Sequence, residues 1–246
     1  MLIQKIYKIQ NILKDMNVDG WLIYDFKGSN DIAYKILNIP SDLHITRRFY
    51  YFIPKIGDPV QIVSAVESNV LNKLNLPGKK VVYSNLSSLK YELSYILSDI
   101  KTVAMEYSPN NMIPYISKVD AGTIELIRSY GINVVSSGDI IARLVAIWTK
   151  DQYEENKMVS KNLYKIVKDA FQYIGEAISQ NKIITEYDVQ SFIMNKFSEF
   201  NYYTDFPPIV AINANAADPH YEISKEKSAT IKKGDLVLID LWCKAN

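Results

Sequence analysis

The sequence predicts a mixed α/β protein in two parts, residues 1–147 and 148–246, and three observations lead to this prediction. Helical and strand periodicities alternate along the first part, which is typical of helices packed on a sheet. A Gly-Asp-Pro turn at 57–59 joins two short apolar runs into a hairpin, so the sheet has antiparallel neighbours. A short polar stretch at 149–151 then precedes a long amphipathic helix, which marks a domain boundary.

The beginning of the chain predicts a helix, a strand and the hairpin. Apolar residues recur at helical spacing and form a stripe that faces the core (Leu2, Ile3, Ile6, Ile9, Ile12, Leu13 and Met16). Gly20 suits the turn that ends this helix. A buried strand is predicted at 21–24, a loop at 27–31, a helix from Ile32, and the hairpin strands at 46–54 and 60–63.

The same alternation continues to residue 144. Helices are predicted at 66–74 and 87–100, from 123 to 130, and from 139 onward; strands are predicted at 80–83, 102–106 and 133–136.

The second part begins near 148–151 with a predicted helix over 152–179. Apolar residues lie on or near one of its faces (Tyr153, Met158, Leu163, Val167, Ala170, Phe171, Ile174 and Ile178). Thr185 is the predicted N-cap of the next helix, which runs to about Phe200, and Asp188 completes a capping box. Neither helix carries a cluster of candidate ligands, so both are interpreted as scaffold. Short apolar runs at 208–212 and 236–241 predict two buried strands.

Composition excludes several function classes. The chain is 48% hydrophobic and 22% charged, as globular proteins are. Its net charge of +1 gives no electrostatic basis for binding nucleic acid or an anionic membrane. No apolar run reaches the roughly 18 residues of a membrane span, and the charged first helix is unlike a signal peptide. The single Cys243 excludes an internal disulfide. We therefore expect a cytoplasmic protein without nucleic-acid or membrane partners.

The candidate site lies in residues 203–246. The run 236–241 places Asp240 in apolar surroundings, where a carboxylate is costly unless a metal, a cation or several donors compensate it. Such an Asp can also cap a neighbouring helix. His220, one strand and one loop upstream, favours a metal-centred site, because a neutral histidine there can stabilise an oxyanion or move a proton. One carboxylate alone does not hold a metal tightly, however, and a loop histidine with satisfied hydrogen bonds is a common alternative.

The chain resembles a known family at this point. Gly-Asp-Leu-Val-Leu-Ile-Asp-Leu (234–241), following Pro-His-Tyr (219–221), resembles the pita-bread metallopeptidases of the aminopeptidase P and prolidase branch. Asp-Gly at 19–20, Tyr-Asp-Phe-Lys-Gly-Ser-Asn at 24–30, Met-Glu-Tyr-Ser-Pro at 105–109 and Val-Asp-Ala-Gly at 119–122 resemble the amino-terminal domain of creatinase and prolidase relatives. Trp242 and Cys243 depart from the family, which usually has Gly shortly after this strand.

The resemblance implies a creatinase/prolidase-type amino-terminal α/β domain over 1–147 and an incomplete pita-bread α+β domain over 148–246. It implies that Asp240 is the first ligand of a dinuclear metal site and that His220 is a catalytic residue beside the metals. The implied cofactors are two divalent ions (Mn, Co or Zn), which activate a hydroxide in the complete protein. The family's other ligands, a second Asp, a His and two Glu, do not occur before residue 246, so the chain as given is expected to be an inactive fragment that binds little or no metal.

The implied reaction is that of an Xaa-Pro aminopeptidase, which hydrolyses the bond before proline in a peptide with proline at the second position. The complete protein is expected to be a homodimer. Two alternatives remain open: an Xaa-Pro dipeptidase (prolidase), and a non-catalytic truncated or binding protein of the same fold.

Two features of the first part also invite a functional interpretation. Arg47 and Arg48, beside His44, could bind a carboxylate or phosphate, or could be ordinary charged residues at a loop and sheet edge. Glu106 could act as an acid or base, but we interpret it as a residue that caps or orients the loop at 107–114.

Overall fold

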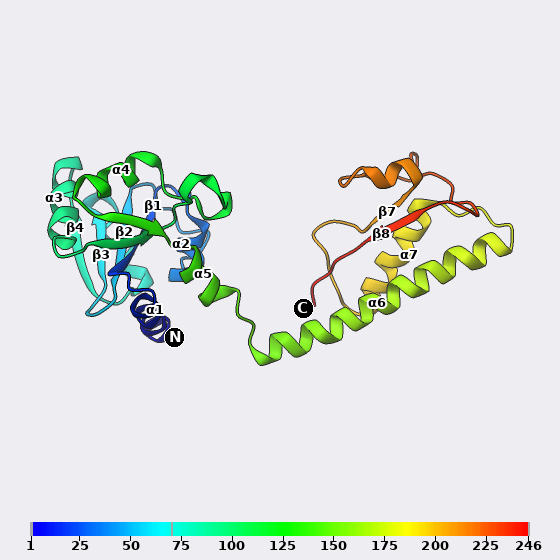
Figure 1. The fold of residues 1–246 in the computed structure, drawn as a ribbon, viewed down its shortest axis with the longest axis horizontal. Helices are drawn as coiled ribbons and strands as arrows, with labels where there is room; N and C mark the ends of the chain where they lie inside the picture. The colour runs from blue at the N-terminus through cyan, green and yellow to red at the C-terminus, as the bar shows by residue number, and fades with distance from the viewer. Residues whose placement is uncertain (1, 70, 246) are drawn as a thin grey trace. The chain divides into compact units, whose positions relative to one another are not determined.

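A computed structural model describes residues 2–69 and 71–245, and its fold is mixed α/β, as predicted. The chain divides into two compact units, Met1–Ile147 (unit 1) and Trp148–Asn246 (unit 2). Figure 1 shows unit 1 in blue to green and unit 2 in green to red. In the described ranges, no helix combines the length and the apolar character that crossing a membrane requires.

Unit 1 is built on a six-stranded mixed sheet with the strand order β4-β3-β2-β1-β5-β6. Its strands are β1 (Gly20–Asp25), β2 (Phe49–Pro54), β3 (Val60–Ser64), β4 (Lys79–Tyr83), β5 (Thr102–Met105) and β6 (Asn133–Ser136). The pairs β1–β2 and β2–β3 are antiparallel, and the other three are parallel. The predicted hairpin is present between β2 and β3, and Gly57 adopts a positive φ of 104° in its turn.

Helices cover both faces of this sheet (Figure 1). Side chains of α1 (Leu2–Asp15), α2 (Asp31–Leu37) and α5 (Gly138–Val145) form one core, and those of α3 (Leu86–Ile96) and α4 (Ala121–Ser129) form the other. The central strand β1 contributes to both, with Trp21 and Ile23 in the first core and Leu22 and Tyr24 in the second. All its residues are therefore buried, as expected for a strand enclosed on two sides.

Three predictions for unit 1 were wrong. Gly20 does not form the turn after α1: Asn17 adopts the left-handed conformation there (φ 53°), and Gly20 begins β1, where a Cβ would collide with the Phe52 ring. Ile3 is exposed. Residues 66–74, of which Val70 is outside the described ranges, form the short 3-10 helices η1 (Ala65–Glu67) and η2 (Leu71–Leu74) instead of one α-helix. The Ser64 hydroxyl accepts a hydrogen bond from the Val66 N–H, and this local bond competes with α-helical hydrogen bonding.

Two further 3-10 helices, η3 (Pro109–Asn111) and η4 (Pro114–Ile116), follow β5.

Unit 2 consists of two helices and an antiparallel strand pair. They are α6 (Lys150–Ser179), α7 (Glu186–Glu199), β7 (Ile209–Ile212) and β8 (Val237–Asp240), with the 3-10 helix η5 (Asn213–Ala217) after β7. Thr185 and Asp188 form the predicted capping box of α7. The core contains apolar residues from α6, α7 and β7, together with Ile184 and Ile231.

Two predictions for unit 2 were wrong in part. Tyr153, Met158 and Phe171 of α6 are exposed, because the buried face of the helix follows a different phase (Val159, Ile166, Ala170, Ile174 and Ala177). The strand β8 is not buried throughout. Its Val237 and Ile239 pack on the core while Leu238 and Asp240 are exposed, because core residues cover only one face of the β7–β8 pair. Asp240 is therefore not enclosed in apolar surroundings.

Candidate functional site

A cavity of about 740 Å³ in unit 2 is lined by both predicted site residues, His220 and Asp240. Asp240 is the last residue of β8, and His220 lies in the loop that follows η5. The other lining residues are mostly apolar and include Phe206, Pro208, Pro219 and Trp242. Two residues that are 20 positions apart in the sequence therefore contribute to one concave surface with largely apolar walls.

Strand pairing places Asp240 at this cavity. Asp240 pairs with Ile209 and Ile239 with Val210, so alternate β8 side chains point toward and away from the core. Ile239 packs on the core, and Asp240 therefore faces the cavity, where it is exposed. The start of β7 is tied to α7 by the Gln190 side-chain amide, which donates to the Pro208 carbonyl at 2.7 Å.

A series of turns places His220. The backbone N–H of His220 donates to the Asp218 carboxylate at 2.9 Å, and the N–H of Tyr221 donates to the Asp218 carbonyl at 3.2 Å. Such Asx-type bonds fix the backbone around His220. Within the described residues the imidazole itself has no hydrogen-bond partner, and the side chain is exposed, so it is available to a ligand in the cavity.

Sequence reasoning missed a third residue, Glu186, the first residue of α7. It is fully buried, and its carboxylate accepts four hydrogen bonds, from the N–H groups of Ile212 and Ala229 and from the side chains of Asn215 and Tyr221. Burial, together with the Glu186 carboxylate, raises the pKa of Tyr221 to about 12. In the sequence, an acidic residue in the first turn of a helix is ordinary, because it complements the helix dipole. No sequence signal distinguished Glu186 from such a residue.

The implied pair of metal ions does not fit the described residues alone. A protein metal site needs about three protein ligands per ion, and residues 2–69 and 71–245 contain no group of three His, Cys, Asp or Glu side chains able to hold one. His220, Glu222 and Asp240 line one cavity without forming such a group.

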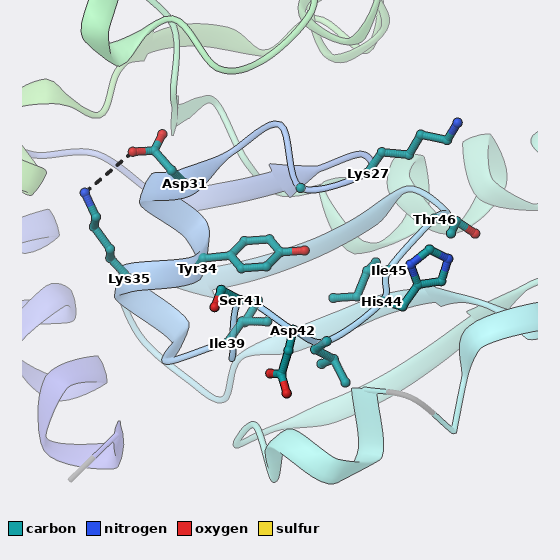
Figure 2. Close-up of a pocket in the computed structure, with 12 residues that line it drawn as sticks. Lys27, Asp31, Tyr34, Lys35, Ile39, Ser41, Asp42, His44, Ile45 and Thr46 are labelled. Carbon is teal, nitrogen blue, oxygen red and sulfur yellow. Dashed lines mark ion pairs between the residues drawn. The ribbon is translucent and has the colours of Figure 1, made fainter.

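Unit 1 contains a larger and more open cavity of about 1070 Å³ (Figure 2). Figure 2 shows Tyr34 of α2 projecting into it, between Lys27 and the segment that carries Ser41, Asp42 and His44. Its charged groups are already paired in part, since Asp31 contacts Lys35 at 3.6 Å and Lys118 at 2.9 Å. The lining has no surplus of one charge that would indicate a ligand class.

The arginine pair of unit 1 does not form a single site with His44. His44 is among the residues that line the cavity in Figure 2, whereas Arg48 lines a different one with Tyr50 and Asp120. The Arg48 guanidinium lies 5.5 Å from the centre of the Phe26 ring, and the Arg47 N–H donates to Glu67 at 3.0 Å. The contact with Phe26 supports a structural role for Arg48, whereas the bond to Glu67 involves only the backbone of Arg47.

Glu106 does not orient the loop at 107–114 through its side chain, contrary to our interpretation. Its buried carboxylate accepts hydrogen bonds from Trp21 Nε1 (2.5 Å), Asn30 Nδ2 (2.8 Å) and Ser137 Oγ (3.1 Å). Burial raises the pKa of Glu106 to about 7, although these three donors lower it. The residue links β1, the start of α2 and the start of α5, and it lies in unit 1.

Comparison with known proteins adds the following findings. Residues 160–246 match metallopeptidase family M24. The chain is similar to the prolidase from Thermococcus sibiricus (20% identity, TM-score 0.52, covering 100% of this chain and 62% of that one). It is also similar to dipeptidase PepE from Mycobacterium ulcerans (14% identity, TM-score 0.53, covering 97% and 59%).

At these identities the likeness concerns the fold, and it extends over both units. The chain spans about 60% of the length of these two solved structures. No curated protein sequence matches it.

Proposed function

We propose that this chain forms part of a prolidase-type hydrolase, an Xaa-Pro dipeptidase, because its residues 160–246 match metallopeptidase family M24. The similar structures bear the names of a prolidase and a dipeptidase, which favours the dipeptidase alternative over the aminopeptidase reaction expected first from the sequence. The proposed substrate is a dipeptide with proline at its second position, and we further propose a cytoplasmic location, in keeping with the single free Cys243.

The observation that carries the proposal is the cavity shared by His220 and Asp240. In the proposed roles, Asp240 is a ligand of a divalent metal and His220 donates a hydrogen bond to the reacting carbonyl oxygen or moves a proton. The walls suit the rest of such a substrate, because Phe206, Pro219 and Trp242 offer apolar surface to a pyrrolidine ring. Asp240 is one ligand only, so the other metal ligands would come from polypeptide outside these 246 residues.

The test uses the protein that contains this chain together with those further ligands, supplied with Mn²⁺, Co²⁺ or Zn²⁺. Asp240→Asn is expected to lose both bound metal and hydrolysis of Xaa-Pro dipeptides, because the amide keeps the shape of the carboxylate and loses its charge. His220→Ala is expected to keep the metal and to lose on the order of a hundredfold in rate.

Metal content by mass spectrometry and dipeptide hydrolysis distinguish these outcomes. Glu199→Gln, a change of an exposed carboxylate on α7, is the matched control and should alter neither quantity. An Asp240→Asn variant with full metal content and full activity would refute the proposal.

A non-catalytic role for residues 1–246 by themselves is a second candidate, favoured by the lack of a three-ligand group in the described residues. We expect this chain alone to bind metal weakly and to hydrolyse no Xaa-Pro dipeptide. Stoichiometric metal that survives dialysis of the isolated chain would contradict this expectation.

We also propose that unit 1 is a creatinase/prolidase-like amino-terminal domain and that unit 2 is the first part of a pita-bread domain. Limited proteolysis should then cut near residues 149–151 or in the exposed stretch 225–227. Early cleavage inside the fully buried β1 would contradict the division.

A further inference from the structure

Glu186 is a buried carboxylate compensated by hydrogen-bond donors. It has no exposed surface, and no Lys, Arg or His among the described residues forms an ion pair with it. Burying an ionised carboxylate is expensive unless hydrogen bonds replace the lost water. Here Oε1 accepts from Ile212 N at 2.8 Å and from Asn215 Nδ2 at 3.0 Å, and Oε2 accepts from Tyr221 Oη at 2.8 Å and from Ala229 N at 2.9 Å.

These four donors lie on both sides of His220 in the sequence. Ile212 is the last residue of β7 and Asn215 belongs to η5, so two donors precede His220. Tyr221 directly follows it, and Ala229 lies beyond the exposed stretch 225–227. One carboxylate at the start of a rigid helix therefore holds both ends of the loop that carries the histidine.

Tyr221 is the closest link between Glu186 and His220. Its hydroxyl donates to Glu186 Oε2 and accepts from Asn215 Nδ2 at 3.0 Å, which fixes the side chain of the residue that directly follows His220 in the sequence. Two bonds to neighbouring residues support the same anchor, since Tyr187 N donates to Ser228 Oγ at 2.7 Å and Glu186 N donates to the Ala229 carbonyl at 3.1 Å.

We propose that Glu186 is a positioning residue: through Tyr221, Asn215 and the two backbone N–H groups, it fixes the loop that presents His220 to the cavity containing Asp240. The positioning itself follows from these contacts. Its importance for catalysis rests on the proposed function, in which His220 acts on the substrate.

The composition of the chain offers a direct readout, because His220 and His44 are its two histidines and they lie in different units. Nuclear magnetic resonance of the chain labelled at histidine with ¹³C and ¹⁵N reports the order and the chemical shift of both rings without substrate or metal. His44 then serves as an internal reference in every sample.

Two variants test the anchor. Glu186→Gln keeps the shape of the side chain but has one acceptor oxygen in place of two, so it cannot receive all four donors. We expect the His220 ring to lose order and its chemical shift to move toward that of free histidine, while His44 is unchanged. Tyr221→Phe removes one hydroxyl and should produce a smaller change in the same direction. Glu199→Gln, on the exposed face of the same helix, is the control and should leave both rings unchanged.

Methyl signals of the unit 2 core establish that each variant is folded, and if Glu186→Gln unfolds the unit, Tyr221→Phe decides the question. Unchanged His220 signals in folded variants would overturn the proposal, as would a wild-type His220 ring as mobile as free histidine. Because the readout needs no activity, it can succeed even where the peptidase proposal fails. In an active protein both variants should retain metal and lower kcat more than they raise KM.

Discussion

Glu106 in unit 1 and Glu186 in unit 2 are both fully buried, yet they are compensated in different ways. The three donors to Glu106 are side chains of Trp21, Asn30 and Ser137. Two of the four donors to Glu186 are backbone N–H groups, and all four lie in the stretch 212–229, from the last residue of β7 to the segment before β8.

The difference follows from the surroundings. Unit 1 encloses its sheet between two cores, so Glu106 links elements that apolar packing already holds in place. Unit 2 has a single core, and the segment 213–230 contributes few buried apolar side chains to it. A buried carboxylate there replaces the packing that the segment lacks. The same residue type thus joins core elements in one unit and anchors a loop in the other.

The largest effect should come from Glu186→Ala. The change leaves backbone N–H groups without an acceptor, at about 1–3 kcal/mol for each buried group, so the free energy of unfolding of unit 2 should fall by roughly 4 kcal/mol. Hydrogen exchange read peptide by peptide should show the loss first at 212–229. Glu106→Ala is the matched change and should act on unit 1 peptides. If either change lowered the protection from hydrogen exchange equally in both units, the two carboxylates would not act locally as described.

A smaller effect, visible only as pH varies, should come from Glu106. Its pKa rises from 4.5 to about 7 on folding, so between these values the folded state binds the proton more tightly than the unfolded state. The stability of unit 1 should therefore decrease as pH rises from 4.5 to 7, by at most about 3 kcal/mol.

Glu106→Gln should remove this slope, and it should also lower stability at all pH values because its amide group faces the donor Asn30. Urea denaturation at several pH values measures both. The exposed Glu125→Gln is the control and should leave the slope intact. If the pH dependence of stability persists in Glu106→Gln, it arises from another titratable group.

The smallest effects should come from the helix caps. Thr185→Ala removes the hydroxyl that caps α7, and Asn85→Ala removes the cap of α3 in unit 1. Each change should cost about 1 kcal/mol. Thr185→Ala should in addition increase exchange at 213–229, because it loosens the helix end that carries Glu186, whereas Asn85→Ala has no such second effect. Identical local responses would argue against the anchor.

The strands β1 and β8 show how far the sequence predicts this structure. Both are short apolar runs, and we predicted both as buried. β1 is buried because cores lie on both of its faces, and β8 is half exposed because one face of its two-stranded sheet is covered. The residues of a short apolar run predict that it forms a strand, but they do not predict whether one or both faces of that strand are covered by a core. Local signals were more reliable: the capping box of Thr185 and the turn at Gly57 depend on neighbouring residues, and both are present.

The candidate site was predictable to a similar extent. His220 and Asp240 line one cavity, although their chemical roles stay predictions. Glu186 was missed because its function depends on four residues distributed over 212–229, and no local pattern marks that convergence.

The register of β7 and β8 has a consequence for folding fidelity. With Ile209 opposite Asp240, Val237 and Ile239 of β8 face the core, and the Asp240 carboxylate lies on the exposed face together with Leu238. A slip by one residue would exchange the two faces of β8 and press Asp240 into the apolar core while Ile239 became exposed. The penalty for a buried, uncompensated carboxylate makes that misaligned state improbable. Asp240 thus disfavours the misaligned register of β7 and β8. The register that remains is the one that places the Asp240 carboxylate at the cavity.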